Sequence, residues 1–192
     1  MKKRIVIFAS GNGTNAKKII EYFQSSETAE VIQVIASKKD AKVLEVADSH
    51  HIASEFIPKE GFQNPEKLIE KLQSQKVDLI VLAGFLLKIP PAFVEAFPNK
   101  IINIHPALLP KFGGKGMYGK FVHEAVAASE EKETGITIHY VNEQYDEGAI
   151  IFQTAVPVAK NDTPEQIAKK VQHLEHQHFP KVIETLLSTP NE

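Results

Sequence analysis

The sequence lacks several features that define whole classes of protein. None of its 192 residues is cysteine, which excludes disulfides, thiolate catalysis and cysteine-ligated metals and is compatible with a cytoplasmic location. Its formal net charge is only -2, so the basic surface of a general nucleic-acid binder is missing. No apolar run approaches the roughly 20 residues that cross a membrane. We therefore expect neither nucleic acid nor a membrane as a partner.

Length and composition are those of one globular domain. Hydrophobic residues make up 43% of the chain and charged residues 24%, a balance typical of a protein with a single sizeable core. No repeat, low-complexity tract or linker interrupts the pattern. We predict one domain over residues 1–192.

The first hundred residues alternate between strand and helix patterns. Short apolar runs predict strands at residues 5–9, 31–36, 56–57, 77–83 and 101–104. Amphipathic spacing predicts helices at residues 14–23, 42–51 and 65–75 and after Pro90-Pro91. Strands that alternate with helices form a parallel sheet covered on both faces. The predicted fold class is therefore α/β, with a Rossmann-like, mostly parallel sheet.

The second half has a different pattern. Residues 135–141 and 149–156 are rich in β-branched and aromatic side chains and flank a short polar stretch. This pattern predicts an antiparallel C-terminal strand pair. Residues 164–187 predict a closing amphipathic helix that Pro180 would kink.

A glycine loop joins the first predicted strand to the first helix. It consists of Gly11, Asn12, Gly13, Thr14 and Asn15. Backbone N–H groups at such a helix start bind phosphate, and glycines let the backbone approach it. The loop also fits a dinucleotide fingerprint, but the second strand does not end on the acidic residue that binds the ribose of NAD.

Two alternatives for the glycine loop stay open at this point. NADP is compatible with the loop because Lys38 or Lys39 could face its extra phosphate. A tight turn that binds nothing would also explain the glycines.

Two side chains that can take part in catalysis lie at the end of the strand predicted at residues 101–104. Asn103 and His105 are two residues apart, so on an extended chain they point to the same side. An amide donor beside an imidazole suits a reaction in which a carbonyl oxygen becomes negative. Because ligands in open α/β sheets bind beyond the carboxyl ends of the strands, we expect residues 11–15, 84–89 and 103–105 to line one crevice.

Four segments of the chain occur in the order found in one enzyme family. They are Gly11 to Asn15, Leu82 to Phe85, Asn103 to Lys111 and Asp146 to Gly148. Through them, over residues 4–187, the chain resembles the folate-dependent formyltransferases. The glycine loop narrows the resemblance to those with a phosphorylated acceptor, the phosphoribosylglycinamide formyltransferases.

The resemblance implies a reaction and a set of residues. A formyl group would pass from 10-formyltetrahydrofolate, the co-substrate, to the amine of glycinamide ribonucleotide in purine biosynthesis. Asn103, His105 and Asp146 match the catalytic residues of the family. The glycine loop would bind the substrate phosphate and Glu175 its ribose hydroxyls. The resemblance implies no metal, small-molecule partners only, and a monomer or homodimer.

The folate site is also implied by the resemblance. Its members here would be Leu86, Leu87, Lys88, Ile89, Asn103, Asn142 and Asp146, the first four through main-chain groups. In the chemistry, Asn103 and a protonated His105 would donate to the developing oxyanion. Asp146 would raise the pKa of His105.

The chain departs from the familiar pattern in two places. Leu86 to Ile89 lack an arginine that familiar members have in this segment, so any side-chain role of that arginine is lost. A second arginine, which contacts the folate tail in some members, is replaced by Pro65, so Lys67 or Lys88 would have to compensate. Residues 113–119 form a glycine-rich insert, either a substrate cover or a surface insertion without a role. His123 would begin a helix after this insert. The family also makes Leu109-Pro110 a candidate cis bond.

Other functions and sites stay open. Formyltetrahydrofolate hydrolases and other formyltransferases share the core, although a methionyl-tRNA formyltransferase would need a further domain after it and a deformylase one before it. A nucleotide-binding module without chemistry is a second class. His139 fits either a place near the catalytic pair or a core position, and His173, His176 and His178 fit a solvated helix face better than a metal site.

Overall fold

A computed structural model describes residues 1–189, which form one seven-stranded sheet with the order β3-β2-β1-β4-β5-β6-β7. The pairs from β3 through to β5 are parallel, and β5, β6 and β7 pair antiparallel. The strands are β1 Lys3–Ala9, β2 Ala29–Ala36, β3 Ala53–Phe56, β4 Leu79–Leu82, β5 Ile101–His105, β6 Glu133–Tyr140 and β7 Ile150–Pro157. The predicted α/β fold with an antiparallel C-terminal pair is confirmed.

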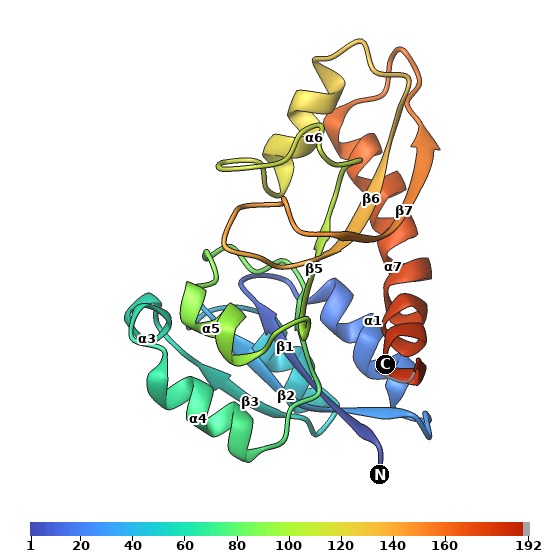
Figure 1. Cartoon of the computed structure of the whole chain (residues 1–192). Coiled ribbons are helices and arrows are strands. Elements are labelled where there is room, and N and C mark those ends of the chain that lie inside the picture. The colour runs from blue at the N-terminus through green and yellow to red at the C-terminus, as the bar shows by residue number, and fades with distance from the viewer. Residues whose placement is uncertain (190–192) are drawn as a thin grey trace.

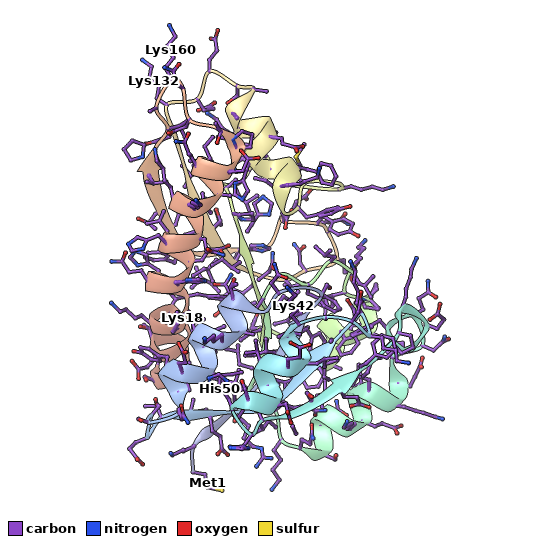
Figure 2. All side chains as sticks on the ribbon, turned by 180° about the vertical axis from the view of Figure 1, so that it is seen from behind. Met1, Lys18, Lys42, His50, Lys132 and Lys160 are labelled. Carbon is purple, nitrogen blue, oxygen red and sulfur yellow. The ribbon has the colours of Figure 1, made fainter. Side chains whose placement is uncertain are left out.

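Helices cover both faces of the sheet, as Figure 1 shows. They are α1 Thr14–Phe23, α2 Val43–Ser49, α3 Lys59–Gln63, α4 Glu66–Ser74, α5 Pro91–Ala96, α6 Lys120–Ala127 and α7 Pro164–Ser188. Alternate residues of β1 face opposite sides, so Ile5 and Ile7 pack with α1, α2 and α7, whereas Val6 and Phe8 pack with α3, α4 and α5. Figure 2 shows the first of these faces from behind, with α1 and α7 side by side.

Helix α7 is the longest helix and connects distant parts of the fold. A capping box between Thr163 and Gln166 starts it, and Pro180 lies buried within it. It packs against α1, α6, β6 and β7. It therefore brings its middle turn, with Glu175, beside the start of α1.

Several boundaries differ from the sequence predictions. Helix α3 was not predicted, because its five residues carry a single buried apolar side chain, Phe62, and show no periodicity. Strand β3 begins at Ala53 rather than Phe56, and α6 begins at Lys120 rather than at His123. Within residues 1–189, no helix combines the length and the apolar character that a bilayer span requires.

Candidate active site

A cavity of about 540 Å³ opens beyond the carboxyl ends of β4 and β5. It collects side chains from the glycine loop, from the segments after β4 and β5, from residues 114–119, and from α6, β6 and α7. The lining includes Asn15, Leu86, Leu87, Lys88, Ile89, Asn103, His105, His123, His139, Asn142, Asp146 and Glu175. The predicted convergence of three loops in one crevice is confirmed, since each contributes to this wall.

Most of the residues predicted for the site line this cavity, but four residues of the glycine loop do not. Gly11, Asn12, Gly13 and Thr14 do not line the cavity, whereas Asn15 of the same loop does. The phosphate role of these four residues therefore stays a prediction. Lys88 lines the cavity and Lys67 does not, which favours Lys88 as the replacement for the missing arginine.

The glycine loop has a shape that only glycine fits well. Gly13 has φ +73° and precedes α1 as its N-cap residue. A Cβ atom there would lie 2.6 Å from Cγ2 of Val43, so the loop is packed directly against α2. No side chain caps α1, and its first N–H groups are available for an anion.

Ser10 links the segments that follow β1, β2 and β4 through hydrogen bonds. Its hydroxyl oxygen accepts a hydrogen bond from the Leu86 N–H at 2.9 Å and lies 2.6 Å from the hydroxyl of Ser37. Its own N–H donates to the carbonyl of Gly84 at 3.0 Å. Ser10 was not predicted as a site residue. A hydroxyl at the carboxyl end of a strand was the only signal for it in the sequence.

Asn15 and Glu175 join the glycine loop to α7. The Asn15 amide Nδ2 donates to Oε2 of Glu175 at 3.0 Å, while its Oδ1 is buried without a partner. Burial raises the pKa of Glu175 to about 7, and the hydrogen bond from Asn15 opposes that rise. An unpartnered acceptor and a carboxyl group at one end of the cavity suit a ligand that carries hydroxyl or amine donors.

His139 orients the amide of Asn103. Its Nδ1 donates to the carbonyl of Tyr140 at 2.9 Å, so its Nε2 is free to accept the Asn103 amide N–H at 3.1 Å. The two residues are register partners on β5 and β6. Burial lowers the pKa of His139 despite nearby Asp146, which keeps the ring neutral and able to accept. Both alternatives for His139 hold, because it is buried and also contacts Asn103.

His105 has one nitrogen fixed and one free. Its Nε2 donates to the carbonyl of Phe112 at 2.7 Å, and Nδ1 lies 3.6 Å from Oδ2 of Asp146. A neutral ring therefore has its lone pair on Nδ1, within the cavity. Protonation at Nδ1 would place the new charge beside the carboxylate.

Asp146 raises the pKa of His105 as predicted, but burial outweighs this effect and the net shift is downward. Burial is the largest influence and lowers the pKa, whereas the charge of Asp146 and the hydrogen bond to Phe112 only partly offset it. The ring is 3% exposed, and a nearly dry imidazole loses more solvation on charging than one carboxylate returns. His105 is thus neutral in the free protein and suited to accept a proton.

Asp146 lies between His105, His139 and the glycine-rich insert. Its Oδ2 accepts the N–H of Gly114 at 2.9 Å, and its Oδ1 lies 3.7 Å from Nε2 of His139. The backbone of Asp146 has φ +57°, a conformation that aspartate and asparagine tolerate better than most residues. The carboxylate is therefore held by its own turn and by the insert, and it faces two imidazole nitrogens.

Residues 113–119 form part of the cavity rather than a distant surface loop. All of them except Gly113 contribute to its lining. On the opposite side, the Lys88 ammonium lies 5.5 Å from the ring centre of Tyr145. Residues 114–119 thus lie where a substrate cover would lie, and a role for the insert stays a prediction. Leu109-Pro110 is cis, as predicted.

Of the three histidines on α7, His178 lies against Phe152, with ring centres 5.1 Å apart, and His176 has its Nε2 atom buried without a hydrogen-bond partner. Across residues 1–189, no cluster of three or more His, Asp or Glu side chains is arranged to hold a metal ion.

Known proteins resemble the chain over nearly its whole length. The formyl transferase family model matches residues 3–183. A chloroplastic phosphoribosylglycinamide formyltransferase of Arabidopsis thaliana is 44% identical over 188 residues, which cover 95% of this chain and 64% of that protein. The Bacillus subtilis phosphoribosylglycinamide formyltransferase is 37% identical over 194 residues, which cover 98% of this chain and 97% of that protein.

Solved structures give the same result. The phosphoribosylglycinamide formyltransferase of Bacillus halodurans superposes with a TM-score of 0.87 at 36% identity, covering 97% of this chain and 96% of the other. Glycinamide ribonucleotide transformylase 1 of Geobacillus kaustophilus superposes with a TM-score of 0.89 at 30% identity, covering 98% of this chain and 100% of the other. The chain spans 64% and 61% of the length of two plant relatives. On its sequence, its fold and its cavity, the chain belongs to the formyl transferase family, as its motifs predicted.

Proposed function

We propose that the protein transfers a formyl group from 10-formyltetrahydrofolate to the amine of glycinamide ribonucleotide. The observation that carries the proposal is the meeting of Asn103, His105 and Asp146 in a cavity that also contains Asn15 and Glu175. The phosphoribosylglycinamide formyltransferases described above support the same acceptor. We also propose a cytoplasmic location, to which the cysteine-free sequence is suited.

The site has the groups that formyl transfer requires. The amine must lose a proton as it attacks, the formyl oxygen becomes negative, and the folate nitrogen must gain a proton as it leaves. Neutral His105 offers a bare Nδ1 to accept the amine proton, and Asp146 beside it stabilises the resulting imidazolium. The same proton can then pass to the leaving nitrogen.

Asn103 is placed to stabilise the oxyanion. One of its amide N–H groups is held by His139, which fixes the plane of the amide and aims the other N–H. A fixed donor does not have to reorganise as the negative charge develops. His139 is thus a positioning residue for Asn103.

The two ends of the cavity suit different substrates. Asn15 and Glu175 lie beside the exposed start of α1, which fits a phosphorylated ribose. Leu86 to Ile89, with Asn142 and Tyr145, form the other end, and we assign it to the folate. A half-exposed Leu86 and Tyr145 with a lysine over its ring suit an aromatic ligand with an acidic tail.

Formyl transfer and formyl hydrolysis can be separated in one assay. Purified protein is mixed with 10-formyltetrahydrofolate with and without glycinamide ribonucleotide, and both tetrahydrofolate and the formylated ribonucleotide are quantified. We expect turnover that requires the ribonucleotide and yields equal amounts of the two products. Turnover without the ribonucleotide would favour the hydrolase.

The variant His105→Ala tests the central residue. Loss of a proton-transfer group lowers the rate about 10²- to 10⁴-fold. His178→Ala is the matched control, because this histidine lies on α7 against Phe152 and outside the cavity. Equal losses in both variants would argue against a catalytic role for His105.

A further inference from the structure

His123 lies in the cavity wall and has no part in the chemistry described so far. It is 9% exposed, and its Nδ1 atom is buried without a hydrogen-bond partner. It projects from α6, immediately after the glycine-rich insert. A buried polar atom without a partner lowers stability and calls for a functional or structural explanation.

The surroundings of His123 keep its ring neutral. Burial lowers its pKa, and the charge that His105 carries when protonated lowers it further. Asp146, Glu175, Lys88 and Lys115 are the other charged side chains in the same wall, and none of them is among the causes that shift the pKa of His123. A second proton would also put an unpartnered N–H at buried Nδ1, so the neutral ring with its proton on Nε2 is favoured.

The Asn103–His105 pair has only one donor left for an oxygen that becomes negative. Asn103 gives one N–H to His139, and neutral His105 gives its only N–H to the carbonyl of Phe112. One N–H of Asn103 is left. Because Nδ1 of His123 is buried, Nε2 is the ring nitrogen that a bound ligand can reach.

We propose that His123 is a neutral hydrogen-bond donor whose Nε2–H binds the formyl oxygen together with the Asn103 amide. This inference rests on the proposed formyl transfer. It adds His123 to Asn103 as a second hydrogen-bond donor to the oxyanion. In the reaction, the bond from the amine nitrogen to the formyl carbon forms and the bond to the folate nitrogen breaks. The amine proton passes through His105 to the folate nitrogen, and His123 keeps its own proton throughout.

Three substitutions separate a donor from a base and from a packing residue. His123→Phe keeps the ring shape without a donor. His123→Gln offers an amide N–H near the position of Nε2, and His123→Asn offers one near that of Nδ1. The control is His178→Phe, outside the cavity. Thermal unfolding of each variant identifies any that fail to fold.

We expect kcat to fall about 100-fold in His123→Phe, with a smaller loss in His123→Gln than in His123→Asn. The pH dependence of kcat/KM in His123→Gln should keep the midpoints of the unsubstituted protein. Normal kcat in His123→Phe would overturn the inference while leaving formyl transfer intact. A shifted or missing pH limb in His123→Gln would also overturn it, because His123 would then carry the proton.

A second measurement needs no substitution. Nitrogen-15 NMR of the histidine rings in the unsubstituted protein reports which nitrogen carries the proton. We expect the His123 signal to stay that of the neutral Nε2–H form from about pH 5 to 8, and titration in that range would overturn the inference. Absence of formyl transfer by the unsubstituted protein would instead overturn the proposed function, and this inference with it.

Discussion

Two glycine-containing loops bound the cavity, and they use glycine for different reasons. In the first loop, residues 11–15, a Cβ atom on Gly13 would overlap Val43 of α2. In the second, residues 112–119, Gly114, Gly116 and Gly119 all have positive φ, yet a Cβ atom on any of them would meet nothing within 4 Å. Gly13 of the first loop is held by packing, and so is Gly113 of the second, where a Cβ atom would lie 2.5 Å from Cδ2 of Leu109. Gly114, Gly116 and Gly119 of the second loop need glycine only for their backbone angles.

Each loop is also tied to one carboxylate. Glu175 accepts the amide of Asn15 in the first loop, and Asp146 accepts the N–H of Gly114 in the second. Residues 114–119 of the second loop are mostly exposed, so this hydrogen bond has a larger share in placing them. The comparison indicates that Asp146, the proposed catalytic carboxylate, also organises the insert, while Glu175 joins a loop that is already in place.

Asp146→Asn should have the largest effect on activity. The amide keeps the size of the side chain and tolerates φ +57°, but it cannot stabilise the imidazolium of His105. We expect kcat to fall about 100-fold or more, with KM for both substrates little changed. Steady-state kinetics measure this, and a defect confined to KM would contradict the assignment.

Gly13→Ala tests the packed loop and should reduce stability most. The left-handed backbone costs a residue with a Cβ about 1–2 kcal/mol, and the overlap with Val43 adds about 1–3 kcal/mol. KM for the ribonucleotide should rise while folate binding is retained. Urea unfolding measures the free energy. Val43→Ala in the same chain should recover only a small part of the loss, because Cβ and Cα of residue 43 would still lie 2.8 and 2.9 Å from the new Cβ. Full recovery of the stability would show that the conflict is confined to the Cγ atoms of Val43.

Glu175→Gln tests the other carboxylate through pH. The folded pKa is about 7, raised by burial from 4.5. Between these two pH values the unfolded chain loses a proton that the folded protein keeps, so the free energy of unfolding falls as pH rises. The full loss is about 3 kcal/mol. Urea unfolding between these pH values should show this slope in the unsubstituted protein and not in Glu175→Gln. Parallel slopes would refute the raised pKa.

The packed loop and the catalytic strand were accessible from sequence because their signals are local. A glycine pair between a strand and a helix predicts a βα turn, and the spacing of Asn103 and His105 predicts a shared side. The sheet topology then places the carboxyl ends of parallel strands at one edge. Family motifs supplied Asp146 and Glu175, which lie 43 and 72 positions after Asn103.

The electrostatic properties of the site were not accessible in the same way. The pKa of His105 depends on how completely the ring is buried, and burial depends on Phe112 and on parts of the chain far from β5. The role of Ser10 likewise depends on Ser37 and Leu86, which reach it only in the folded sheet. Local patterns predict which residues share an edge, whereas solvation depends on the whole fold.

Gly116→Ala is the matched counterpart of Gly13→Ala and should have the smallest effect. Both glycines have positive φ, at +89° and +73°, but a Cβ atom on Gly116 meets no neighbour. Only the backbone cost of about 1–2 kcal/mol applies, and it falls on a loop with little packing, so local opening of the loop should absorb part of it. Urea unfolding should therefore give a smaller loss than Gly13→Ala, and hydrogen exchange should quicken at the Gly114 N–H. A loss equal to that of Gly13→Ala would mean that the second loop is packed as tightly as the first.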